Sequence, residues 1–158
     1  MTTTRPGQSD PSTLSGLAGR SGLELIRAIA TGEASPPNIA RLLGMEMVEA
    51  DEGRVVFTLD TKPDFSNPLG TVHGGIHATL LDSAMGCAVH TTLPAGVGYT
   101  TLELKVNYVK AITLDAGTLT CVGEVIHVGG RVATAEGRLT DSAGRLLAHG
   151  TTTCMIFR

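Results

Sequence analysis

Residues 62–75 read KPDFSNPLGTVHGG, and residues 76–93 continue as IHATLLDSAMGCAVHTTL. The first stretch is dense in Gly, Pro and Asn, which is typical of a loop. The second has helical length, few turn signals and apolar or small residues on nearly all sides. A helix that is apolar all round is a buried one, so the sequence predicts a central helix that ends at Leu93-Pro94-Ala95-Gly96.

Strands are predicted on both sides of this helix. Before it, the alternating apolar residues of 45–60 predict a bent strand, or a hairpin that turns at Asp51-Glu52-Gly53. After it come four long strand-like runs joined by turn candidates: Tyr99–Val109, Gly117–Val128, Arg131–Thr140 and Arg145–Phe157. One buried helix wrapped by an antiparallel sheet is an α+β architecture.

The first 44 residues are predicted to contain a tail and short helices. Residues 1–16 are rich in Thr, Ser, Gly and Pro and are expected to form a flexible tail. Residues 17–44 are expected to form short helices: apolar residues of Ser21–Thr31 recur at helical spacing, and a second helix follows Pro36-Pro37 and ends at Gly44. These helices could cap a channel or pack on a neighbour. The remaining residues, 45–158, form the main domain.

Composition narrows the function classes. The 158 residues are 42% hydrophobic and 17% charged, with a formal net charge of -3, which fits one globular domain without a nucleic-acid surface. No apolar run approaches the ~20 residues of a membrane span, and residues 1–16 have no hydrophobic core like that of a signal peptide, so a cytoplasmic location is expected. Cys87, Cys121 and Cys154 lie far apart in apolar stretches, as buried reduced thiols do.

Two features of the quoted stretch suggest chemistry. Gly74-Gly75 lies where the loop becomes the helix, and free amides at a helix N-terminus bind an anion or a polarised carbonyl. Asp82 is the second feature: its helical neighbours three and four positions away include no charge partner. Because a lone carboxylate on a buried helix is costly, Asp82 is expected to face a cavity.

The spacing of these two features adds a constraint. Gly74 and Asp82 are eight residues apart, which is roughly 12 Å along a helix axis. One carbonyl group therefore cannot contact both residues of the same chain. Either the site uses two subunits, or one of the two residues is a bystander.

The segment Asn67–Gly75, followed by Asp82 nine residues after His73, resembles the hotdog-fold thioesterases. The similarity is greatest to the branch named for phenylacetate degradation (PaaI-like), and it covers about Met45 to Phe157. It implies a hotdog fold in which the long central helix is wrapped by the sheet, with the N-terminal helices as additions. It also implies dimers whose sites lie at the subunit interface, and a homotetramer built from two such dimers.

The resemblance further implies roles for individual residues. The Gly74 amide would be the oxyanion donor and Asp82 of the other chain the general base or nucleophile. Asn67 would position the water or the thioester, and His73 would order the loop. Thr101 falls where relatives place a Ser or Thr that holds the attacking water.

One position departs from the pattern of these relatives. Some of them keep a Thr one turn after the acid, whereas this chain has Gly86. The way in which the attacking water is held is therefore left open, and so is the choice between general-base catalysis and an anhydride intermediate.

The remaining candidates concern coenzyme A and metals. Arg131 follows the Gly129-Gly130 turn and is a candidate for the CoA phosphates, because guanidinium groups pair well with phosphate oxygens. Gly130, Gly75 and Lys105 are further CoA-binding candidates. His73 and His77 could share a helix face, but no third ligand is evident, so no metal site is expected. No cofactor is expected either, since CoA is part of the substrate.

Together these observations predict hydrolysis of an acyl-CoA thioester to the acid and CoA. Two alternatives stay open: a hotdog hydratase acting on enoyl or hydroxyacyl thioesters, and a non-catalytic acyl-CoA sensor. The sequence does not specify the acyl group.

Overall fold

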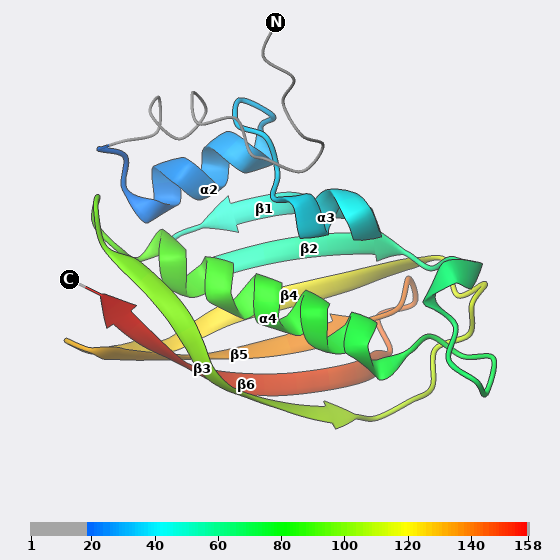
Figure 1. Cartoon of the computed structure of the whole chain (residues 1–158). Coiled ribbons are helices and arrows are strands. Elements are labelled where there is room, and N and C mark those ends of the chain that lie inside the picture. The colour runs from blue at the N-terminus through cyan, green and yellow to red at the C-terminus, as the bar shows by residue number, and fades with distance from the viewer. Residues whose placement is uncertain (1–18, 158) are drawn as a thin grey trace, which may run out of the picture.

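The structure, a computed structural model, describes residues 19–157 (Figure 1). The flexible tail predicted for residues 1–16 lies outside this range. The described residues form two short N-terminal helices, one sheet, one short 3-10 helix and one long helix. Within them, no helix is both long enough and apolar enough to cross a membrane.

The sheet has six antiparallel strands in the order β1-β2-β4-β5-β6-β3. β3, the first strand after the long helix, therefore lies at one edge, and β1 lies at the other. The strands are β1 (Met45–Asp51), β2 (Arg54–Asp60), β3 (Gly98–Tyr108), β4 (Thr118–Val128), β5 (Val132–Thr140) and β6 (Leu146–Phe157).

The long helix α4 (Gly74–Thr91) lies against one face of this sheet and contacts all six strands, because the sheet wraps around it (Figure 1). Its inward side chains are fully buried, and this burial supplies much of the core. The buried side chains of α4 include Leu80, Leu81, Ala84, Met85, Ala88 and Val89.

Glycines in the middle of three adjacent strands let α4 come close to the sheet. Gly123 of β4 pairs with Gly137 of β5, which in turn pairs with Gly150 of β6. A Cβ atom on Gly123 would lie 2.3 Å from the carbonyl carbon of Ala84, so no side chain fits there. At this glycine row, formed by Gly123, Gly137 and Gly150, the backbone of α4 approaches the backbone of the sheet.

Two short helices lie beyond β1 in Figure 1: α2 (Gly22–Ala30) and α3 (Asn38–Leu43). α2 begins with a capping box, in which Ser21 and Glu24 satisfy each other's backbone N–H groups. α3 ends at Gly44, whose φ of 80° is the left-handed conformation that glycine adopts readily.

These elements confirm the predicted α+β architecture. The stretch 45–60 is a hairpin, with its turn at Glu52-Gly53 between β1 and β2. The predicted bounds of the four later strands differ from the observed ones by one residue at most. A further short element, the 3-10 helix η1 (Pro63–Phe65), lies within the loop that leads to α4.

Candidate active site

Asp82 lies at the middle of α4 and is only partly exposed. Its Oδ1 accepts a hydrogen bond of 2.8 Å from the Thr101 hydroxyl of β3. Both residues line a cavity of about 640 Å³, within the usual size range of small-molecule sites. The structure therefore places the predicted acid beside the predicted threonine, with one carboxylate oxygen left to bind a water or substrate atom.

A β-bulge directs Thr101 toward this cavity. The pairing of β3 with β6 shifts register between Thr101 and Glu103, which leaves Leu102 as the extra, exposed residue. Before the bulge, odd-numbered side chains such as Thr101 face α4; after it, Leu104 and Val106 do. Bulges that redirect a side chain are common next to active sites.

Two ionisable side chains of the cavity, those of Cys87 and Tyr99, are held in their neutral form. Burial, with a contribution from the charge of Asp82, raises the pKa of the Cys87 thiol to about 12. Burial also raises the pKa of the Tyr99 hydroxyl above its ordinary value. Because a thiol with such a pKa is protonated near neutral pH, Cys87 is a poor nucleophile.

The N-terminus of α4 presents one free amide. The Gly75 N–H donates to Nδ1 of His73 (2.9 Å), and the Ile76 N–H donates to the His73 carbonyl (2.9 Å). The Gly74 N–H has no acceptor among the described residues. Since Nδ1 of His73 accepts a hydrogen bond, its proton in the neutral ring is on Nε2. His73 thus caps the helix instead of lying on its face beside His77.

Tyr108 packs directly against this N-terminus. Its hydroxyl donates to the Gly74 carbonyl (3.2 Å), and a Cβ atom on Gly74 would lie 3.2 Å from the Tyr108 ring. The ring is 5.6 Å from that of His77, which is buried with no hydrogen-bond partner at either nitrogen. Gly74, His77 and Tyr108 line a small hollow separate from the cavity of Asp82.

Asn67 organises the loop before α4. Its Oδ1 accepts the backbone N–H groups of Leu69 (2.9 Å) and Thr71 (3.1 Å), and its Nδ2 donates to the Thr71 hydroxyl (2.8 Å). Asn67 does not line the cavity of Asp82. In the single chain it shapes the loop, and one Nδ2 hydrogen remains for a further acceptor.

The CoA-binding candidates lie away from Asp82. Gly130 and Arg131 line a hollow with Met155–Phe157, and Arg131 is exposed there. Lys105 is exposed on the edge strand β3, and Gly75 is exposed at the start of α4. No group of three or more His, Cys, Asp or Glu residues gathers as a metal site within residues 19–157.

Several residues at the site are not singled out by their sequence context. Tyr99 lines the cavity beside Asp82, and its hydroxyl lies 2.8 Å from where a Cβ atom of Gly86 would be. The place of the threonine found one turn after the acid in some relatives is thus filled by this ring. The sequence gives no role to Tyr108, and it offers His77 only as a metal ligand without a third partner.

Comparison with known proteins agrees with this geometry. Residues 69–148 match the thioesterase superfamily. A phenylacetic acid degradation-related protein from Ralstonia eutropha JMP134 is 30% identical in sequence, with a TM-score of 0.75 over 82% of this chain and 98% of that one. The PaaI protein of the E. coli phenylacetic acid degradation operon has a TM-score of 0.76 over 87% of this chain and 97% of its own, at 20% identity, which shows the fold alone.

A curated relative points the same way. Human acyl-coenzyme A thioesterase 13 is 27% identical over 127 residues, which are 79% of this chain and 89% of the human protein. Half of the chain matches the superfamily, and the relatives point to the same family. The antiparallel sheet around one helix is consistent with both. The chain therefore belongs to the thioesterase superfamily, as a hotdog-fold thioester hydrolase of the PaaI-like branch.

Proposed function

We propose that this protein hydrolyses an acyl-CoA thioester to a free acid and CoA, with Asp82 as the reacting carboxylate. The observation that carries the proposal is the Asp82–Thr101 hydrogen bond of 2.8 Å inside a largely apolar cavity. A carboxylate held in this way can act on a substrate whose acyl group fills the cavity. The CoA part of the proposal is supported by the similarity to human acyl-coenzyme A thioesterase 13.

Thr101 fixes the orientation of the carboxylate during the reaction. With Oδ1 occupied by the threonine hydroxyl, Oδ2 can accept a proton from water as its oxygen attacks the thioester carbon. The C–S bond then breaks, and the proton passes to the CoA thiolate. Alternatively, Asp82 attacks the carbon first and expels CoA, and water cleaves the resulting anhydride to release the acid and restore the carboxylate.

The oxyanion donor in this proposal is the Gly74 N–H. It is the unpaired amide at the positive end of an 18-residue helix, where developing negative charge on the carbonyl oxygen is stabilised. Because Gly74 and Asp82 line different cavities of one chain, each site would combine Gly74 of one copy with Asp82 of a second. The catalytic unit is then a homodimer, and two such dimers would form a tetramer.

The remaining contacts would hold the substrate. Arg131, beside Gly130, is exposed and would pair with CoA phosphates, with Lys105 as a further cation. Gly75 and His73 would flank the thioester, and Asn67 would keep the loop in place. The reaction requires no metal ion or redox cofactor, because the carboxylate and the amide supply the base and the oxyanion site.

Thiol release measured with a dye tests the proposal. A panel of acetyl-, hexanoyl-, lauroyl- and phenylacetyl-CoA is offered to the wild type, to Asp82→Asn and to Asp64→Asn. Asp82→Asn should lower kcat by about two orders of magnitude or more, because the amide is neither a base nor a nucleophile. Asp64→Asn is the matched control, since Asp64 is an exposed carboxylate of η1.

Three other results would contradict the proposal, and each points to a different conclusion. If the folded wild type releases no thiol from any substrate but hydrates an enoyl-CoA, the protein is a hydratase. If it binds acyl-CoA tightly and converts none, it is a sensor. Equal activity of Asp82→Asn and wild type would remove Asp82 from the mechanism.

A further inference from the structure

The cavity of Asp82 has a wall that comes from outside the region matched to the thioesterase superfamily. That match begins at residue 69, whereas the outer wall is built by residues 29–40, at the end of α2, in the following loop and in α3. The wall residues are small or apolar for the most part. They are Ile29, Ala30, Thr31, Gly32, Pro36, Pro37, Ile39 and Ala40.

The facing wall is also apolar. Met45 and Met47 of β1 and Phe57 of β2 contribute to it, together with Cys87 and Tyr99. None of the described residues that line the cavity is Lys or Arg, and the two charged ones, Glu46 and Asp82, are acidic. Phosphate groups of CoA would be repelled from such a space, whereas a hydrocarbon chain would lose its contact with water there.

We propose that residues 29–40 form the outer wall of an acyl-binding pocket that accepts an aliphatic chain. This inference rests on the proposed function, in which the thioester carbon lies at Asp82. From there the chain would pass between the wall and the strands β1 and β2. The flexible side chains of Met45 and Met47 adapt to a chain of irregular shape, which suits an alkyl group better than a planar ring.

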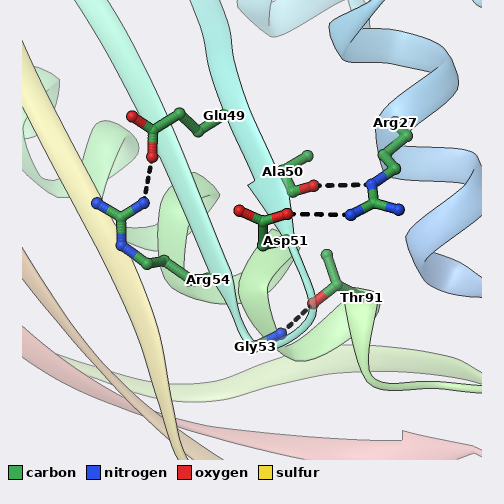
Figure 2. Close-up of polar contacts among 7 residues, drawn as sticks. All are labelled: Arg27, Glu49, Ala50, Asp51, Gly53, Arg54 and Thr91. Carbon is green, nitrogen blue, oxygen red and sulfur yellow. Dashed lines mark hydrogen bonds and ion pairs between the residues drawn. The ribbon is translucent and has the colours of Figure 1, made fainter.

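Fixed contacts hold the wall in place relative to Asp82. Arg27 of α2 donates from Nε to the Ala50 carbonyl and from Nη2 to Asp51 of β1, each at 3.0 Å (Figure 2). On the other side of α2, the Gly22 N–H donates to the Leu93 carbonyl (2.9 Å) just after α4. α2 is thus tied both to the sheet and to the helix that carries Asp82.

The start of α2 also fits closely against α4. A Cβ atom on Gly22 would lie 1.7 Å from the carbonyl oxygen of His90, so only glycine permits this approach. The hairpin between β1 and β2 is bound to α4 as well, by a 2.8 Å hydrogen bond from Gly53 to Thr91 (Figure 2). Because none of these anchoring residues belongs to the wall, substitutions in the wall leave the anchors of α2 and of the hairpin intact.

Two wall variants test the inference. Ala30→Phe places a large ring in the cavity, and Ile39→Asp puts a charge on its wall. Relative to wild type, each should lower kcat/KM for lauroyl-CoA by about tenfold or more, and for acetyl-CoA by less than about threefold, because only the long chain reaches the wall. Leu42→Asp is the matched control: Leu42 lies on α3, is 72% exposed and does not line the cavity.

Several results would overturn the inference. They are unchanged lauroyl-CoA turnover in both variants, an equal loss for acetyl- and lauroyl-CoA, or a wild-type preference for phenylacetyl-CoA over every aliphatic substrate. Calorimetry with the unreactive thioether S-dodecyl-CoA separates binding from catalysis. Weaker binding to Ala30→Phe by about tenfold would support the pocket even if the wild type hydrolysed nothing, whereas unchanged binding would refute it.

Discussion

Both ring nitrogens of His77 are buried without a hydrogen-bond partner inside the described structure. Its hollow also contains Tyr108 and Lys110, and His73 lies one turn away. Burial lowers the pKa of His77, and the nearby His73 lowers it further. A neutral imidazole in this position costs free energy, because its polar atoms have left water and found no replacement.

We therefore expect His77→Leu to raise the free energy of unfolding at pH 7 by about 1 kcal/mol. As pH falls below the unfolded-state pKa of about 6.5, the unfolded chain takes up a proton that folded His77 refuses, so wild-type stability decreases. The variant should show a shallower decrease between about pH 6.5 and 5. Urea unfolding at several pH values measures both effects.

His90 contributes to the same slope, since burial lowers its pKa too. In a double variant, His77→Leu with His90→Leu, the free energy of unfolding should decrease even less steeply over the same pH range. If His77→Leu is instead less stable than wild type at pH 7, the imidazole has a hydrogen-bond partner in solution, and the penalty assigned to it is wrong.

Asp82 shows which residues a sequence can predict. A lone carboxylate among apolar helical neighbours is costly unless it faces a cavity, and it does face one. The role of Asn67 is less accessible: its side chain holds the turn at Leu69 and Thr71, and its role in positioning the water or the thioester stays a prediction. Local turn bonding and substrate positioning use the same amide, so residue type alone does not separate them.

At the scale of elements, the glycine row determines how closely α4 packs on the sheet. A Cβ atom on Gly123 would meet backbone atoms of Ala84 and Met85 at 2.3–2.6 Å, and backbone cannot move aside as a side chain can. We expect Gly123→Ala to lower the free energy of unfolding by about 3 kcal/mol. Urea denaturation of the variant and the wild type at pH 7 measures the difference.

Gly137→Ala is the comparison. Its Cβ would meet the Leu81 and Met85 side chains at 2.9–3.2 Å, and these flexible side chains can shift. A smaller loss than for Gly123→Ala is expected, while Gly130→Ala, with open space at its Cβ, should change little. Equal stability of Gly123→Ala and wild type would mean that helix and sheet are farther apart than the structure has them.

The bulge in β3 explains why the site was harder to predict than the strand. Strict alternation would put Thr101, Lys105 and Asn107 on one face. The extra residue Leu102 reverses the alternation, so that Thr101 shares the inner face with Leu104. Nothing in the local composition marks Leu102 as unpaired, because the shift is set by pairing with Thr153 and Cys154 of β6, far along the chain.

At the scale of the whole molecule, the fold was predictable because two signals are long and unambiguous. α4 is apolar or small on nearly all sides, and four strand-length runs follow it with turn residues between them. The contribution of residues 29–40 to the cavity was not predictable. Apolar residues in this segment are expected whether it packs against another part of the protein or against a ligand. Only the tertiary arrangement therefore assigns them to the pocket.

The proposed division of the site between two copies rests on this arrangement as a whole. Gly74 begins α4 and Asp82 lies eight residues later, so they are roughly 12 Å apart along the axis. Gly74→Pro removes the proposed oxyanion donor at the first helical position, which tolerates proline. Gly74→Ala keeps the N–H and has a similar Cβ contact with Tyr108, and it is therefore the matched control.

Alone, Gly74→Pro should lose about 10²–10³ in kcat, and Asp82→Asn a similar amount, while Gly74→Ala keeps most activity. When the two inactive variants are coexpressed with different tags, a heterodimer has one intact site, built from Gly74 of one chain and Asp82 of the other. Random pairing should then restore about one quarter of wild-type activity. If the purified heterodimer stays as inactive as its parents, Gly74 and Asp82 act within one chain, and the shared site must be abandoned.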